Sequence, residues 1–335
     1  MTDIADIPLS ILDLVSVREG GTVAEALEHG IALAQAAERL GMKRFWVAEH
    51  HAMEGIAGGA TSVVLSRIGA ATSTIRIGSG GIMLPNHTPF QIAEQFGTLD
   101  ALYPGRVDLG LGRAPGAGPE LQRALRKDLH HAAEMFPQDV AELRALLTGE
   151  PRLPIAATPG LGASVEMWML GSSLFGAQLA ARLGLPYAFA AHFAPTHLDE
   201  ALEVYRARFE PSAALAKPHV MVAMNLFCAE TSEEAELLAS SQLQSFVRLR
   251  TGTPGKLPRP VRNYRESLPL QAQAMLRQIS VASATGTPEE VRQQMTALAE
   301  RTGADELILA GATFDPAARI RSLELAVGAL TSEPA

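Results

Sequence analysis

A carboxylate and two imidazoles directly follow an apolar run at residues 45–51, which read FWVAEHH. Glu49, His50 and His51 therefore bring one acid and two groups that titrate near neutral pH to the end of a predicted strand. A metal centre is disfavoured, because adjacent histidines rarely converge on one ion and the sequence has no HExxH or CxxC spacing. One imidazole is therefore predicted to be a proton donor or acceptor, and a hydrogen-bonded histidine without a chemical role is the alternative.

Hydroxyls and a basic residue follow two other predicted strands. The segment Gly171-Ser172-Ser173 joins an apolar strand to a helix, whose free N–H groups and dipole favour an anion. Arg113, at the end of another strand, could add charge-assisted hydrogen bonds to a phosphate. Each feature alone could be an ordinary helix cap or a surface ion pair. Together they predict a ligand with a phosphate tail.

Glycines end two of the predicted strands. Gly80-Gly81 would let a flat group approach the backbone closely, because no side chain intervenes, and a β-bulge is the alternative. The segment GLGRAPG at 110–116 has the wrong glycine spacing for a dinucleotide-binding fingerprint and no helix directly after it. A Rossmann fold is therefore not expected.

Short apolar strands alternate with amphipathic helices along the chain. The predicted strands are 7–15, 44–48, 75–84, 106–112, 165–170, 187–191, 220–229 and 306–310. The predicted helices are 22–40, 60–71, 90–102, 137–147, 173–183, 196–209, 232–249 and 317–330. Apolar strands with helical crossovers indicate an α/β fold with a parallel sheet, and about eight such units predict a closed (β/α)8 TIM barrel, here as one domain over 1–335. Because active sites of such barrels lie at the C-terminal ends of the strands, the groups above should share one rim.

Residues 250–275 are rich in proline and arginine and show no clean period. We interpret them as an excursion between units seven and eight, which is either a mobile lid or a surface crossover.

Composition excludes several classes of protein. The 335 residues carry a formal net charge of -8 and have no basic run, so nucleic acid is not an expected partner. No apolar run approaches the roughly 18 residues of a membrane span. Cys228, the single cysteine, lies in an apolar run and is predicted to be a core residue. No disulfide can form within the chain, which fits a reducing, cytoplasmic location.

Several stretches together resemble the bacterial luciferase-like flavin monooxygenase family, over almost the whole chain. They are VAEHH at 47–51, IGSGGIMLPNHTPFQIAEQFGTLD at 77–100, YPGRVDLGLGRAPG at 103–116, LGSSLFGAQLAARLGLPYAFAAHFAP at 170–195 and TGTPEEV at 285–291. The similarity is closest to single-chain oxidoreductase members. It implies a barrel that binds FMN, which a separate flavin reductase supplies in reduced form. It also implies a flavin C4a-hydroperoxide that oxidises a small-molecule substrate.

The same resemblance implies roles for individual residues. His50 corresponds to the catalytic histidine of the family, which stabilises or protonates the flavin peroxide, and Glu49 and His51 match its neighbours. Gly80-Gly81 corresponds to the non-proline cis peptide under the flavin ring. The predicted cofactor-binding residues are Glu49, Gly80, Gly81, Gly112, Arg113, Gly171, Ser172, Ser173, Gly176, Ala190 and Ala191.

The resemblance implies some of the residues that contact the phosphate. Arg113 and Ser173 match phosphate-binding residues of the family, whereas Arg126 and His131 are both candidates for a second contact. The luciferase catalytic subunit has a cysteine, an acid, a threonine and a bulky aromatic residue at the positions that here are Gly112, Ser172, Gly176 and Ala191. These differences imply a wider pocket and argue against light emission from a long-chain aldehyde. His51 and His192 are predicted to line the substrate pocket.

Two alternative functions stay open. One is a deazaflavin- or flavin-dependent dehydrogenase, in which a hydride moves and oxygen does not react. The other is a flavin-binding protein without turnover. The helix near 58–73 is crowded with small residues, so it can pack closely, either on the barrel or against a second copy. A homodimer is predicted.

Overall fold

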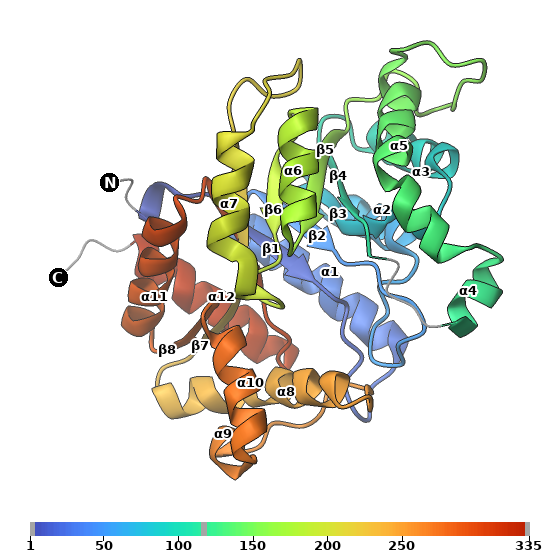
Figure 1. Cartoon of the computed structure of the whole chain (residues 1–335). Coiled ribbons are helices and arrows are strands. Elements are labelled where there is room, and N and C mark those ends of the chain that lie inside the picture. Colours follow the sequence, from blue (N-terminus) through green and yellow to red (C-terminus); the bar gives the residue numbers. More distant parts are fainter. Residues whose placement is uncertain (1–3, 115–118, 332–335) are drawn as a thin grey trace.

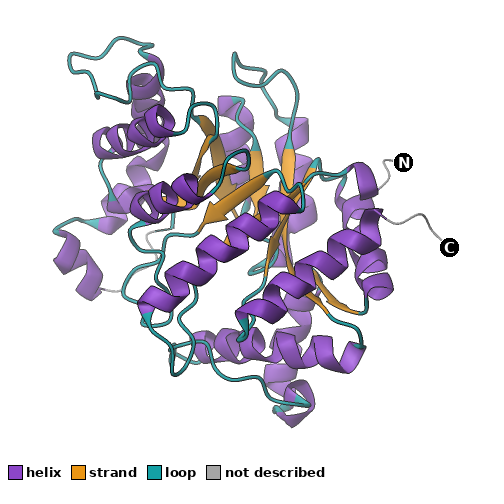
Figure 2. Cartoon of the chain, turned by 180° about the vertical axis from the view of Figure 1, so that it is seen from behind, coloured by secondary structure: helices purple, strands orange, loops and turns teal. Residues whose placement is uncertain are grey.

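Helices enclose a ring of parallel strands in the computed structural model, which describes residues 4–114 and 119–331 (Figures 1 and 2). The ring strands are β1 (Leu9–Asp13), β2 (Arg44–Val47), β3 (Arg76–Met83), β4 (Val107–Gly112), β5 (Glu166–Gly171), β6 (Tyr187–Phe189), β7 (Val220–Cys228) and β9 (Glu306–Ala310). Each pairs in parallel with the next, and β9 pairs with β1 and closes the ring. The predicted (β/α)8 TIM barrel and its eight strands are confirmed.

The predicted crossover helices are all present. They are α1 (Val23–Arg39), α2 (Thr61–Ala71), α3 (Pro89–Leu102), α5 (Leu129–Thr148), α6 (Leu174–Leu183), α7 (Leu198–Ala207), α8 (Ser232–Arg250) and α12 (Pro316–Thr331). One boundary was wrong: α5 begins at Leu129, capped by the Asp128 side chain, and continues through Pro137. Among the described residues, no helix is both long enough and apolar enough to cross a lipid bilayer.

The chain between β7 and β9 is more regular than the predicted excursion at 250–275. After α8 it forms α9 (Tyr264–Ser267), α10 (Leu270–Ser280), β8 (Ser283–Gly286) and α11 (Pro288–Thr302). β8 pairs with the C-terminal half of β7 and lies outside the closed ring. Figure 1 shows α8, α9 and α10 gathered at one end of the barrel. The short helix α4 (Pro119–Leu125) was also not predicted.

Side chains alternate between the interior of the barrel and the layer beneath the helices. On β2, Phe45 and Val47 pack in the outer layer, whereas Trp46 faces the interior. There Trp46 meets Trp168 edge to face, with 5.3 Å between the ring centroids. Cys228 is buried at the end of β7, and burial raises the pKa of its thiol to about 11, so the prediction of a core cysteine is confirmed.

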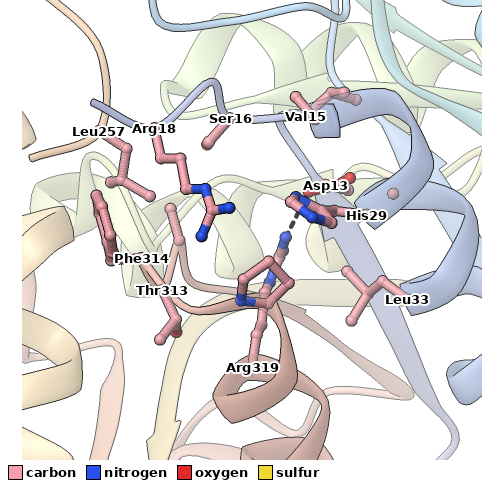
Figure 3. Close-up of a pocket in the computed structure, with 14 residues that line it drawn as sticks. Asp13, Val15, Ser16, Arg18, His29, Leu33, Leu257, Thr313, Phe314 and Arg319 are labelled. Carbon is pink, nitrogen blue, oxygen red and sulfur yellow. Dashed lines mark hydrogen bonds and ion pairs between the residues drawn. The ribbon is translucent and has the colours of Figure 1, made fainter. Parts of the chain in front are cut away.

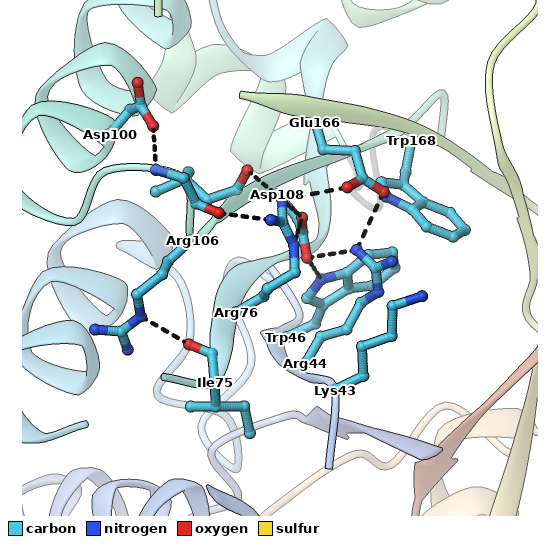
Figure 4. A network of polar contacts seen from close by, with 12 residues as sticks. Lys43, Arg44, Trp46, Ile75, Arg76, Asp100, Arg106, Asp108, Glu166 and Trp168 are labelled. Carbon is cyan, nitrogen blue, oxygen red and sulfur yellow. Dashed lines mark hydrogen bonds and ion pairs between the residues drawn. The ribbon is translucent and has the colours of Figure 1, made fainter. Parts of the chain in front are cut away.

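A buried network of charges lies at the N-terminal ends of the strands, beside the tryptophans (Figure 4). Arg44, whose side chain is 2% exposed, forms ion pairs with Glu306 at 2.8 Å, Asp108 at 3.0 Å and Glu166 at 3.2 Å. Trp46 donates its indole N–H to Asp108 at 2.9 Å. One guanidinium on β2 therefore ties together carboxylates on β4, β5 and β9.

Glu306 keeps its charge inside this network. Burial alone would raise the pKa of its carboxyl group, but the His219 imidazole and the Arg44 and Lys43 cations outweigh burial and lower the pKa to about 2. Ser10 contributes as well, since its hydroxyl donates to Glu306 at 2.5 Å. Glu306 is therefore ionised at neutral pH, whereas burial raises the pKa of Asp108 in the same network.

Arg44→Met is expected to lower the free energy of unfolding by about 3–5 kcal/mol, because it leaves buried carboxylates without their cation. Urea unfolding followed by tryptophan fluorescence measures this loss. Arg321→Gln is the matched control, since Arg321 is 58% exposed in its pair with Glu230, and it should leave the midpoint unchanged. Equal midpoints for the two variants would contradict a supporting role for the network.

Candidate active site

Small residues line the interior near the C-terminal ends of the strands, above the two tryptophans. They are Ala48, Gly80, Gly110, Ala188, Ala223 and Ala310. A Cβ atom on Gly80 would lie 2.5 Å from the Leu12 Cδ1 atom, and one on Gly110 would clash with the Ser79 carbonyl oxygen. Larger side chains do not fit at these two positions. Gly110 is buried, whereas Gly80 and Gly81 are half-buried, so the backbone at the end of β3 is the part of this floor that a flat group could reach.

The glycine pair at the end of β3 interrupts the strand register, in agreement with the β-bulge interpretation, and the approach of a flat group stays a prediction. The peptide bond between Gly80 and Gly81 is cis, as the resemblance implies, and the pairing register with β4 shifts between Ser79 and Ile82. A Cβ atom on Gly81 would lie 2.6 Å from the Gly110 carbonyl oxygen. At Gly112, by contrast, the nearest atom to an added Cβ is 3.7 Å away. Close packing of β3 against β4 therefore requires glycine at Gly81 but not at Gly112.

His50 and His192 lie near enough to one another that a charge on His50 would act on His192. Each has a buried Nδ1 atom without a hydrogen-bond partner in the described part of the chain. Burial lowers the pKa of both imidazoles, and the charge of His50 lowers the pKa of His192 further, to about 4. Both rings are therefore neutral at pH 7, and both offer an unused nitrogen. Trp46 and Ala48 point into the barrel, and His50 is the next residue in this alternation. Its free nitrogen is therefore assigned to the C-terminal end of the barrel.

Glu49 serves the neighbouring loop and not the interior. Its side chain is 1% exposed, and its Oε1 atom contacts the Nε2 atoms of His51 and His87, the latter at 2.7 Å. Its Oε2 atom accepts the Met83 N–H at 3.1 Å. Burial would raise the pKa of Glu49, but the hydrogen bonds of His87 and His51 outweigh burial and lower it. Glu49 therefore holds His51 and the chain after β3 in place.

His87 was missed by sequence reasoning, although it follows a strand end in the polar pair Asn86-His87. Together with Glu49 and His51 it offers three ligating atoms within 4.8 Å of one another. The metal alternative considered from the sequence involved His50 and His51, which is a different pair. In this structure the three groups are already joined by hydrogen bonds to Glu49. The hydrogen bonds to Glu49 explain why these three side chains lie close together.

The predicted phosphate-binding residues lie at the N-terminus of α6. Ser173 is the N-cap, and its side chain makes no capping hydrogen bond, so the first N–H groups of the helix are left for a ligand. The Arg113 guanidinium carbon lies 4.1 Å from the Phe175 ring centroid, in the first turn of α6. Gly171 and Gly176 pack against one another: a Cβ on Gly176 would be 3.5 Å from the Gly171 Cα. The helix therefore begins close to β5.

Other predicted residues have different surroundings. Ser172 is half-buried beside Ser173, and Ala190 donates its N–H to the Gly171 carbonyl at 2.9 Å. Ala191 is fully buried in the layer beneath the helices, so it lies behind the rim and not on it. Arg126 and His131 are both exposed at the junction of α4 and α5, and the choice between them stays a prediction.

Comparisons with known proteins agree on one family. A family model described as luciferase-like monooxygenase matches residues 7–306. A luciferase-like monooxygenase of Escherichia coli (strain K12) is 47% identical over 328 residues, which are 98% of each chain. An N-acetyl-S-alkylcysteine monooxygenase of Bacillus subtilis (strain 168) is 34% identical, over 87% of this chain and 89% of the relative. The crystal structure of apo-MsnO8 superposes with a TM-score of 0.87 at 36% identity, covering 98% of this chain and 100% of that chain.

His192 is expected to stay neutral from pH 6.5 down to about pH 4, because its pKa falls from 6.5 to about 4 on folding. In this window the unfolded chain binds more protons at this residue, so stability should decrease as the pH falls. His192→Gln should make that decrease shallower, whereas His197→Gln, at an exposed histidine, should not. Nitrogen NMR of the imidazoles measures the pKa directly. Titration of His192 near pH 6.5 would contradict its burial against His50.

Proposed function

The chain belongs to the luciferase-like monooxygenase family and is a flavin-dependent monooxygenase, and from this premise we propose that it is the oxygenase of a two-component system. It takes reduced FMN from a separate flavin reductase and reacts it with O2 to give a C4a-hydroperoxide, which oxidises a small organic substrate. The observation that carries the proposal is the neutral His50, whose buried Nδ1 atom has no hydrogen-bond partner among the described residues, at the end of the barrel where glycine and alanine line the interior.

The residues present fit FMN. Gly80 and Gly81 are half-buried and carry no side chains, so their backbone would offer a surface for the ring system. Arg113 and the free N–H groups at Ser173 would hold the phosphate, at the N-terminus of a ten-residue helix. When bound, reduced FMN would supply the electrons that activate O2.

His50 has the properties of the acid–base group that this chemistry needs. Its pKa lies below the ordinary value, so the ring is neutral at pH 7 and can hold a hydrogen bond with either nitrogen. The Glu49 carboxylate partly offsets the effect of burial on the pKa of His50, so the imidazole can still accept a proton. His192, neutral and on the opposite side, would contact the substrate, whose identity the family does not determine.

We further propose that residues 250–275 shield this site, in a single domain that spans 1–335. Leu257 donates its N–H to the Val17 carbonyl at 2.8 Å, and Glu19 donates to the Leu257 carbonyl at 2.8 Å. A Cβ atom on Gly55, in the loop after β2, would clash with the Gly255 carbonyl. The segment thus lies against the loops that follow β1 and β2, where it can exclude water from the rim.

The proposed assembly is a cytoplasmic homodimer that packs through α2. Val63 is 69% exposed on the outer face of this helix, which suits a contact with a second copy. Gly69 is used within the chain, because the Tyr103 ring packs against it and the Tyr103 hydroxyl donates to the Ser66 carbonyl at 2.6 Å. The small residues of α2 therefore serve the fold in part.

Rapid mixing tests the role of His50. The protein with anaerobically reduced FMN, mixed with oxygenated buffer, should show a long-lived flavin C4a-hydroperoxide spectrum. His50→Ala should shorten its lifetime by about 100-fold, the scale of one general acid–base group, whereas His197→Ala should leave it unchanged. Reoxidation at the rate of free FMN would contradict the proposal. Absence of oxygen consumption together with hydride transfer would favour the dehydrogenase alternative.

A further inference from the structure

A cleft lies outside the barrel wall, between the end of β1, helix α1 and the start of α12 (Figure 3). Its cavity volume is about 30 Å³, so it has room for a small ligand only. Asp13 lines it from the outer side of β1: a Cβ on Gly30 of α1 would be 3.1 Å from the Asp13 Oδ2 atom. Leu12, the residue before, packs inside the barrel with Trp46. The cleft is therefore separated from the proposed flavin site by the strand itself.

The charges that face this cleft are not balanced. Arg319 donates to the Asp13 Oδ1 atom at 2.7 Å, and the Asp13 side chain is 2% exposed. Arg18 extends its guanidinium into the same cleft, as Figure 3 shows. Within residues 4–114 and 119–331, the Arg18 guanidinium forms no ion pair with a carboxylate, and its carbon lies 5.6 Å from the Phe314 ring centroid. Two guanidinium groups thus line a cleft whose one lining carboxylate, Asp13, is paired with Arg319 alone.

Acids close to Arg18 in the sequence are committed elsewhere. Glu25 accepts the Thr22 N–H at 2.7 Å in the capping box of α1. Glu19 pairs with Arg248 at 3.0 Å. Neither forms an ion pair with Arg18, although the charge of Arg18 contributes to lowering the pKa of Glu25, so the five donors of that guanidinium are available to a ligand.

Further donors converge on the same space. Thr313 is 8% exposed, and its hydroxyl makes no hydrogen bond to any part of the chain that the structure describes. His29 lines the cleft from α1. The start of α12 at Pro316 borders the cleft, but the Asp315 carboxylate already accepts the Ala317 N–H at 3.0 Å, so this helix end is capped from within the chain. A guanidinium and a hydroxyl are groups that bind oxyanions in proteins.

We propose that this cleft is a binding site for a small oxyanion, either inorganic phosphate or the carboxylate of a small metabolite. Arg18 supplies the charge, Thr313 donates a hydrogen bond, and Arg319 stays paired with Asp13 while adding positive potential. The proposal goes beyond the flavin chemistry and does not depend on it.

The site has a structural consequence for residues 250–275. Leu257 forms one wall of the cleft and bridges to Val17 through its backbone. Arg259 lies over the Phe314 ring at 5.1 Å from its centroid, and Arg18 lies over the same ring. An anion that fixes Arg18 and Phe314 therefore stabilises the contact between this segment and the loop after β1.

Calorimetric titration with phosphate, and separately with acetate, at constant ionic strength tests the proposal. The titrations use Arg113→Gln protein, so that the proposed flavin phosphate site does not contribute. One saturable event is expected, and adding Arg18→Gln should weaken it by about tenfold or more, the scale of a charge-assisted hydrogen bond. Adding Arg152→Gln, which removes an exposed cation from a different loop, should not change it. Thr313→Val keeps the shape of the side chain and should weaken binding to a smaller extent.

The outcomes separate the two ligand sources. Saturation by phosphate alone supports a phosphate site, and saturation by acetate supports a carboxylate site. Bound ligand should also slow hydrogen exchange in a peptide spanning 250–262, and Arg18→Gln should abolish that effect. No saturable binding of either anion, or equal affinity with Arg18→Gln, would overturn the proposal. None of these readouts involves flavin, so they are independent of the proposed function.

Discussion

One buried cation holds the closed barrel together across its interior. Arg44 contacts carboxylates on three other strands while almost no solvent reaches it. Charges taken out of water are stable only when each finds a partner, so every strand that contributes one is constrained in register. The next layer of the interior, toward the C-terminal ends of the strands, needs no ion pairs, because the large side chains of Trp46 and Trp168 fill it. The C-terminal end of the interior can therefore consist of glycine and alanine without leaving the barrel poorly packed beneath it.

The chemistry follows from this order of layers. A floor without large side chains leaves room for a planar ligand, and the strand ends that surround it carry the polar groups. Desolvation keeps His50 and His192 neutral, whereas Glu49 stays ionised because three hydrogen-bond donors surround it. Carboxylate and imidazole, adjacent in sequence, therefore have different tasks: Glu49 fixes the chain after β3, and His50 is the group that we propose to face the ligand. This division explains why a strand would end in FWVAEHH.

The alternation of apolar strands and helices was sufficient to predict the barrel, because a parallel strand buried on both faces has an unmistakable composition. The element α11 was missed although Thr287 and Glu290 form a capping box, a signal as clear as the one at Thr22. β8 is four residues long and has no apolar run, so no pattern could reveal it. His87 could not be assigned, since its partner Glu49 is 38 residues away and meets it only after β2 and β3 pair. The imbalance of charge around Arg18 likewise exists only in three dimensions.

A structure of the protein determined with FMN bound tests the central claim most directly. The account predicts the isoalloxazine ring on the backbone of Gly80 and Gly81, within hydrogen-bond reach of His50, and the phosphate between Arg113 and the N-terminus of α6. A flavin whose phosphate occupied the cleft of Arg18 would contradict it, and so would a ring that lay away from His50.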